Sequence, residues 1–121
     1  MERKQFGIIF YADRRGKSPV LDFIKELEGA NGKQALARLK KVRLFLRRLK
    51  NEGTFAGMPM TRHLDGDIWE LRPLSDRILF AAWDGENYVM LHHFVKKTQK
   101  TPAREIEQAR RNLEDFKLRE A

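Results

Sequence analysis

The chain has 121 residues, of which 41% are hydrophobic and 35% are charged, and it contains no cysteine. This length and composition predict one globular domain over residues 1–121, and the absence of cysteine excludes disulfides, thiolate metal sites and cysteine nucleophiles. No apolar run approaches the roughly 20 residues that span a bilayer, and the N-terminal residues lack the apolar core of a signal peptide. We therefore expect no membrane partner, and the lack of cysteine fits action in a reducing cytoplasm.

The net charge is +8, and it is distributed unevenly along the chain. Residues 33–50 carry eight basic and no acidic side chains, whereas residues 51–95 carry three basic and seven acidic ones. A dense basic segment attracts polyanions and speeds their encounter, and nucleic acid is the commonest such partner. An acidic protein is the next candidate, and the structural alternative is a solvated helix face that charge keeps soluble.

The N-terminal part of the chain predicts a strand followed by a helical hairpin. Residues 6–11 are rich in aromatic and β-branched side chains, which is typical of a strand. Ser18 and Pro19 predict a helix start, because serine can accept hydrogen bonds from unsatisfied N–H groups and proline fits the first helical position. Residues 33–51 repeat apolar side chains at steps of three or four, which predicts a second helix that packs beside the first on a sheet. The expected apolar faces are Val20, Phe23, Ile24 and Leu27 in the first helix, and Leu36, Leu39, Val42, Leu46 and Leu49 in the second.

The C-terminal part predicts four strands and a final helix. The expected strands are residues 61–64, 68–72, 77–83 and 88–94, with an Asp-Gly hairpin turn at residues 65–66. The last strand is apolar on both faces, which indicates a central, covered position. Thr101 and Pro102 predict the start of a helix with the apolar stripe Ala103, Ile106, Ala109, Leu113 and Phe116. The order β, α, α, four β, α predicts an α+β fold with an antiparallel sheet.

The histidines do not form a recognisable metal site. His63, His92 and His93 lack the usual ligand spacing, and adjacent histidines on a strand point to opposite faces. No glycine-rich phosphate loop follows a strand, and no serine–histidine pair suggests acyl transfer. We therefore expect neither a metal nor a cofactor.

Cations are instead expected to converge at one end of the sheet. Arg72 and Arg77 flank a short loop, and Lys96 and Lys97 follow the last strand. If the strands that carry Arg77 and the lysines pair in an antiparallel manner, these side chains meet at the same end, together with His93. The start of the final helix also lies there and offers N–H groups to an anion. The sequence therefore predicts a phosphate site.

Such a site has the parts that RNA cleavage needs. A base takes the proton of the 2′-hydroxyl, cations stabilise the phosphorane, and an acid protonates the leaving 5′-oxygen. Each positioned donor to developing negative charge contributes about 2.7–4 kcal/mol. A lysine can act as the base where burial or neighbouring cations lower its pKa, and this chemistry requires no metal.

Several stretches of the chain resemble the RelE/HigB group of toxins from toxin–antitoxin systems, in particular its phage-derived branch. They are residues 16–20, 64–72, 77–80 and 91–102, and they include Glu-Leu-Arg at 70–72 and Phe-x-Lys-Lys-Thr-x-Lys-Thr-Pro at 94–102. The resemblance implies a RelE-like fold, a cytoplasmic bacterial or phage protein, and cleavage of mRNA on the ribosome. It also implies a cognate antitoxin, often a helix-turn-helix protein.

The resemblance also assigns roles to single residues. Arg72 and Arg77 match the two arginines of the family, and its basic residue after the last strand falls on Lys96 or Lys97. Arg62 stands near a lysine of the relatives. We expect four further cations to contact RNA or the ribosome. They are Arg62, Lys100, Lys40 and Arg47.

One departure from the family keeps alternatives open. Several relatives carry a tyrosine or histidine near the C-terminal helix as general acid or base, but residues 103–121 contain neither. His92, His93 or a lysine would have to substitute. The alternatives are a non-catalytic toxin that binds a protein such as DNA gyrase, as some members of the wider superfamily do, and an inactive RNA-binding module. Arg72 and Arg77 could also be structural ion-pair partners of nearby carboxylates.

Overall fold

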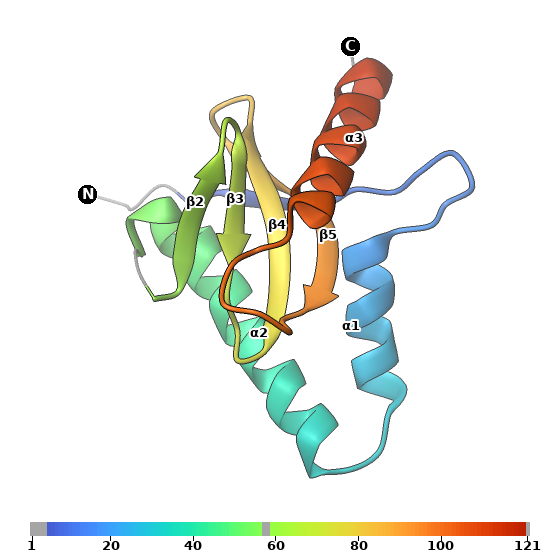
Figure 1. The fold of residues 1–121 in the computed structure, drawn as a ribbon, viewed down its shortest axis with the longest axis vertical. Coiled ribbons are helices and arrows are strands. Elements are labelled where there is room, and N and C mark those ends of the chain that lie inside the picture. Colours follow the sequence, from blue (N-terminus) through green and yellow to red (C-terminus); the bar gives the residue numbers. More distant parts are fainter. Residues whose placement is uncertain (1–4, 57–58, 121) are drawn as a thin grey trace.

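The computed structural model describes residues 5–56 and 59–120, and it confirms the α+β class and the expected order of elements (Figure 1). In chain order, the elements are β1 (Gly7–Phe10), α1 (Pro19–Gly29), α2 (Lys33–Glu52), a short 3-10 helix (Gly53–Ala56), β2 (Thr61–Asp65), β3 (Ile68–Leu71), β4 (Asp76–Trp83), β5 (Asn87–Val95) and α3 (Ala103–Glu120). The 3-10 turn was not expected from the sequence.

The five strands form one sheet in the order β1-β5-β4-β3-β2. Strand β5 lies inside the sheet, between β1 and β4, and helices cover both of its faces, as expected from its two apolar faces. The sheet is antiparallel except at one edge, where β1 runs parallel to β5. The pairing of β4 with β5 contains a bulge, because Leu79 lies opposite His92 while Phe80 lies opposite Met90. Leu91 is therefore an extra residue in β5, and it shifts the alternation of the side chains that follow it.

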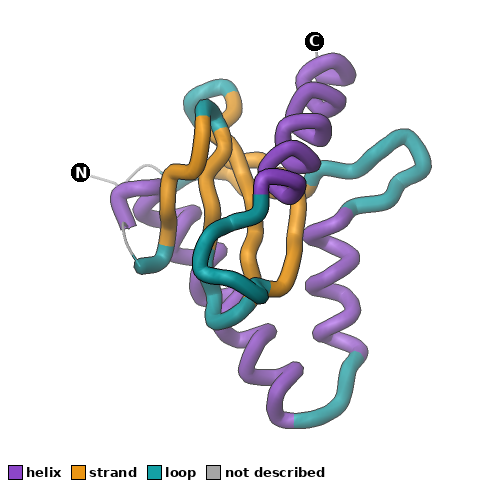
Figure 2. Tube along the Cα trace, viewed as in Figure 1, coloured by secondary structure: helices purple, strands orange, loops and turns teal. Residues whose placement is uncertain are grey.

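Helices cover both faces of the sheet (Figure 2). The two N-terminal helices pack on one face, here called the hairpin face, and α3 packs on the other, the α3 face. On β4, Ile78 and Phe80 join the hairpin-face core, while Leu79 and Ala81 join the α3-face core. Burial on both faces explains why β4 and β5 are nearly continuous apolar runs. In the part of the chain that the structure describes, no helix has the length and apolar character needed to cross a membrane.

The expected apolar stripes are largely buried, but the prediction is wrong at Leu36 of α2 and at Ala103 of α3, which are exposed. All four stripe residues of α1 are buried, as are Leu39, Val42 and Leu49 of α2. Leu36, however, is 52% exposed. The first turns of α2, which carry this residue, extend past the end of the sheet (Figure 1).

The two residues expected to cap helices serve other partners. The Ser18 hydroxyl donates to the backbone oxygen of Tyr11 at 2.7 Å and does not cap α1. The Thr101 hydroxyl donates to Glu70 Oε2 at 2.6 Å, and α3 begins two residues later than Thr101. In both cases the hydroxyl ties the start of a helix to the sheet instead of satisfying helical N–H groups.

Candidate functional site

The β3–β4 turn and the end of β5 lie side by side at one end of the sheet, the lower end in Figure 1. Arg77 lies opposite Phe94 in the ladder, and the Lys96 N–H donates to the backbone oxygen of Ser75 at 2.8 Å. The chain carrying Lys96 and Lys97 therefore leaves β5 beside the turn that carries Arg72 and Arg77, as the antiparallel pairing predicts.

A buried carboxylate organises the arginines on the α3 face. Glu70 is 2% exposed, and its Oε2 accepts the Thr101 hydrogen bond. Its Oε1 lies 3.6 Å from Arg72 Nε and 3.9 Å from Arg77 Nε. We call these four residues the Glu70 cluster. The cluster joins β3, β4 and the segment that leads into α3.

Arg77 is fixed inside this cluster. Its Nη1 donates to the backbone oxygens of Leu74 and Asp76, both at 2.8 Å. Burial lowers the pKa of Arg77, against the attraction of Glu70, although an arginine remains charged at any physiological pH. Leu74 has a φ of 57°, a conformation that leucine rarely adopts, so Arg77 stabilises a strained turn. Arg72 is more accessible, with 19% of its side chain exposed.

A second buried carboxylate lies on the opposite face. Asp76 is 1% exposed and receives two hydrogen bonds from Arg38 of α2, at 3.0 and 2.8 Å, and one from His93 Nε2 at 3.0 Å. The His93 ring also stacks on Phe23 of α1, with 3.5 Å between the centroids. Burial acts to raise the pKa of Asp76, but the hydrogen bonds from His93 and Arg38 outweigh it, so the pKa is lowered. We call Asp76, Arg38 and His93 the Asp76 cluster.

The structure therefore separates His93 from the arginines with which it was expected to converge. Simple alternation after Met90, which lies on the hairpin face, would place His93 on the α3 face. The extra residue Leu91 reverses this order. His92 takes the place opposite Leu79 on the α3 face, and His93 lies opposite Ile78 on the hairpin face. The two histidines do point to opposite faces, as expected.

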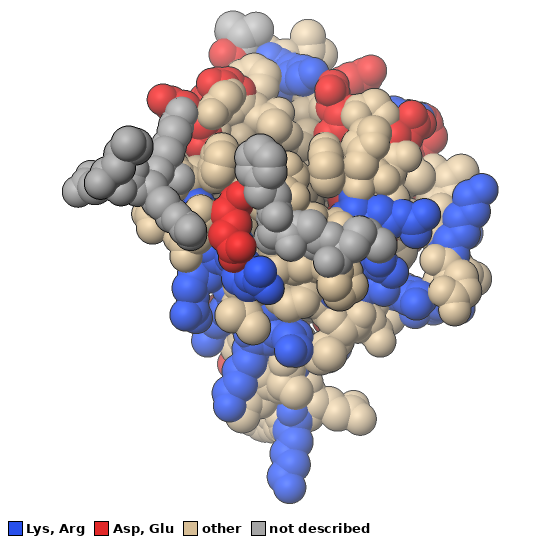
Figure 3. All heavy atoms as spheres, turned by 90° about the vertical axis from the view of Figure 1, so that its left-hand side faces the viewer, with Lys and Arg blue, Asp and Glu red and all other residues tan. Residues whose placement is uncertain are grey.

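The remaining candidate cations fall into two groups. Arg62 and Lys100 line one small cavity of about 120 Å³ together with Thr101, so they lie beside the Glu70 cluster. Lys40 and Arg47 are exposed on α2, which covers the opposite face, and the structure does not bring them to that cluster. In Figure 3, lysine and arginine side chains gather on the lower half of the visible face, while acidic side chains gather at its upper end.

Sequence reasoning missed two partners of these groups. Arg38 was counted only as part of the basic segment, and its position at the edge of the α2 apolar stripe was the sole signal. The second partner is Glu105 of α3, whose Oε1 lies 3.0 Å from His92 Nε2. Within residues 5–56 and 59–120, no group of three or more acidic or histidine side chains could hold a metal ion.

Comparison with known proteins identifies one relationship. The family model described as phage-derived protein Gp49-like (DUF891) matches residues 22–114. The match begins in α1 and ends in α3, so it includes the Glu70 cluster, the Asp76 cluster and the whole of β2 to β5. No curated protein matches the chain.

Proposed function

The chain belongs to the Gp49-like family of phage-derived proteins, a RelE-like family associated with the toxins of toxin–antitoxin systems, and from this premise we propose that it is an endoribonuclease of the HigB-like branch that cleaves mRNA on the ribosome. The family implies an antitoxin as partner. We further propose that this antitoxin is a helix-turn-helix protein and that the pair acts in the cytoplasm. The observation that carries the proposal is that the chain carrying Lys96 and Lys97 leaves β5 beside the β3–β4 turn, which begins at Arg72.

In the proposed reaction, the 2′-oxygen of one nucleotide attacks the adjacent phosphorus, and the bond to the 5′-oxygen of the next nucleotide breaks. The products are a 2′,3′-cyclic phosphate and a 5′-hydroxyl. Arg72 binds the phosphate that gains negative charge. Of Lys96 and Lys97, one in its neutral form takes the 2′-hydroxyl proton, and the other, which is protonated, donates to the phosphorane and passes its proton to the leaving 5′-oxygen. Arg77, which is almost buried, positions the turn and is not expected to touch RNA.

The other basic residues are proposed to guide RNA and the ribosome. Arg62 and Lys100 extend the cationic surface past Thr101, where the strand of RNA could continue. Lys40 and Arg47 lie on α2, across the sheet from the Glu70 cluster, and are assigned to ribosomal RNA because they are exposed. The acidic upper end seen in Figure 3 would orient the basic end toward a polyanion.

A second candidate is an RNA-binding module that does not cleave. Both histidines of β5 are paired with carboxylates, His92 with Glu105 and His93 with Asp76. Residues 103–121 also contain no tyrosine or histidine to serve as acid or base. In this case RNA binding would persist without cut transcripts.

Induced expression of wild type beside Arg72→Ala, with mapping of mRNA 5′ ends, tests the proposal. We expect growth arrest and in-frame cuts in translated transcripts for wild type, and neither for a folded Arg72→Ala protein. Arg14→Ala is the matched control, because Arg14 is exposed in the β1–α1 loop. Arrest without cuts would indicate a protein target such as gyrase, and RNA binding without arrest would indicate the non-cleaving module.

A further inference from the structure

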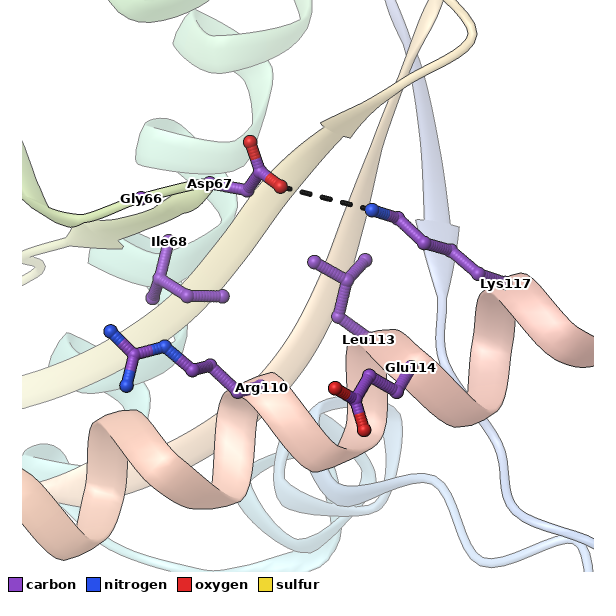
Figure 4. A pocket seen from close by; sticks show the side chains of 7 residues that line it. All are labelled: Gly66, Asp67, Ile68, Arg110, Leu113, Glu114 and Lys117. Atoms are coloured by element: carbon purple, nitrogen blue, oxygen red, sulfur yellow. Dashed lines mark ion pairs between the residues drawn. The ribbon is translucent and has the colours of Figure 1, made fainter.

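Two of the cavities beside α3 that are lined by cations differ in how those cations are used. The first lies between α3 and the tip of the β2–β3 hairpin and has a volume of about 240 Å³ (Figure 4). There, Arg110 pairs with Asp65 and with Glu107, and Lys117 lies 3.7 Å from Asp67. Each cation of this cavity is already paired with a carboxylate. Two of these ion pairs, Arg110 with Asp65 and Lys117 with Asp67, hold α3 against the β2–β3 hairpin.

The second cavity lies near the start of α3 and is larger, at about 410 Å³. Its cations are Lys97 and Arg104, both exposed, and neither forms an ion pair with any residue in 5–56 or 59–120. Phe94 and Glu105 also line this cavity. A volume of this size falls within the range of small-ligand sites, about 300–1,000 Å³.

The second cavity adjoins the proposed cleavage site. Phe94 lies opposite Arg77 in the β4–β5 ladder. Pro102, on the cavity wall, follows Thr101, whose hydroxyl is bound to Glu70. A ligand in the cavity would therefore sit next to the Glu70 cluster.

The acidic wall of this cavity is held in place. Glu105 Oε1 lies 3.0 Å from His92 Nε2, and both side chains are less than one-fifth exposed. The His92 ring in turn stacks loosely on Phe94, with 6.1 Å between the centroids and 29° between the planes. One cavity is thus lined by a carboxylate that His92 holds in place, by Phe94, and by two exposed cations without an ion pair in the part of the chain that the structure describes.

We propose that this cavity binds one nucleotide unit, with the base on Phe94, the phosphate on Lys97 and Arg104, and Glu105 accepting from a base amino or imino group. Aromatic rings stack every base, and a carboxylate accepts from the donor groups of base edges. The inference rests on the proposed function when the unit belongs to an RNA strand. A free nucleoside monophosphate has the same chemistry, and the test separates the two sources.

Equilibrium binding measures how much Phe94 and Arg104 each contribute to the affinity for a nucleotide. The probe is a fluorescent tetranucleotide of 2′-O-methyl RNA, which lacks the attacking hydroxyl, and the second probe is 5′-GMP or 5′-AMP alone. We expect Phe94→Leu to weaken tetranucleotide binding about tenfold, because loss of one stacked base costs about 5- to 150-fold. Arg104→Gln should weaken it by a similar factor, because a hydrogen bond to a charged group is lost. Arg111→Gln, an exposed position on the same helix, should bind as wild type does.

The outcomes separate this inference from the proposed function. Phe94 also packs against the α3-face core, so Arg104→Gln, at an exposed position, is the decisive variant if Phe94→Leu fails to fold. Wild-type affinity for both probes in folded Arg104→Gln would overturn the nucleotide site, even if wild type cuts mRNA. Weakened binding of the tetranucleotide alone would support an RNA subsite, and weakened binding of the mononucleotides as well would support a free-nucleotide site. If wild type binds neither probe and cuts no mRNA, both proposals are wrong.

Discussion

Each face of the sheet buries one carboxylate near the β3–β4 turn, but the two are satisfied differently. Asp76, on the hairpin face, receives direct hydrogen bonds of 2.8 to 3.0 Å from Arg38 and His93. Glu70, on the α3 face, is bonded to Thr101, while its nearest arginine nitrogens lie 3.6 and 3.9 Å away. The Asp76 cluster therefore joins α2 to the sheet, whereas Glu70 attracts its two arginines by charge, and backbone hydrogen bonds fix only Arg77 in addition.

This difference predicts that the Asp76 cluster on the hairpin face serves folding stability and that the Glu70 cluster on the α3 face serves RNA binding. A carboxylate whose bonds are short and complete contributes stability and offers little to a ligand. Glu70 attracts Arg72 from a slightly longer distance, which leaves Arg72 able to shift toward an incoming phosphate, whereas Arg77 stays fixed by its two backbone acceptors. We therefore expect substitutions in the Asp76 cluster to act on folding and those in the Glu70 cluster to act on RNA.

The largest effect on folding is expected for Asp76→Asn. The change removes a buried charge that Arg38 and His93 both contact. Loss of one partner from such a buried charged group lowers the free energy of unfolding by about 3 kcal/mol. Urea denaturation at pH 7 measures it. Asp67→Asn is the control, because its exposed pair with Lys117 is worth less than about 1 kcal/mol.

The pH dependence sharpens this prediction. Because the pKa of Asp76 is lowered in the folded state, its contribution to stability is fully present above the ordinary aspartate pKa of about 3.9 and is lost as the pH falls through the lowered value. The stability gap between wild type and Asp76→Asn should thus be constant from pH 7 to about pH 5 and shrink below about pH 4. A gap that stays constant down to about pH 2 would show that Asp76 does not act through its charge.

A smaller effect, on activity more than on folding, is expected for Glu70→Gln. Glutamine can still accept the Thr101 bond, and Arg77 keeps its two backbone acceptors, so we expect a stability loss of about 1–2 kcal/mol. Removal of the charge between Arg72 and Arg77 should lower mRNA cleavage per folded molecule at least tenfold, because the arginines then repel one another.

The measurement is the cleavage rate in a translating extract, corrected for the folded fraction. Glu26→Gln, at an exposed position of α1, is the control. If Asp76→Asn lowered the corrected rate as much as Glu70→Gln does, the proposed division between the faces would fail.

The same comparison shows what the sequence could and could not predict. Periodicity and turn residues gave the order of elements, and antiparallel pairing was enough to bring Arg72, Lys96 and Lys97 to one end of the sheet. The face of His93 could not be predicted, because a single bulge residue, Leu91, reverses the alternation after it. The pairing of Arg38 with Asp76 could not be predicted either, because the two residues are 38 positions apart in the chain and only the packing of α2 on the sheet brings them together.

The smallest effect is expected in the salt dependence of RNA binding, and it compares a cation from each region. A cation that neutralises a phosphate releases counterions, so log affinity falls linearly with log salt concentration, with a slope close to the number of contacts. Lys97→Gln should reduce this slope by about 0.7–1, the share of one phosphate contact. Arg38→Gln also removes one positive charge, but the Arg38 side chain is paired with Asp76. The salt dependence of this variant should therefore have the same slope as that of wild type. Equal slope changes for the two variants would mean that the protein attracts RNA through its overall charge, and that the basic end of the sheet on the α3 side is not a specific phosphate site.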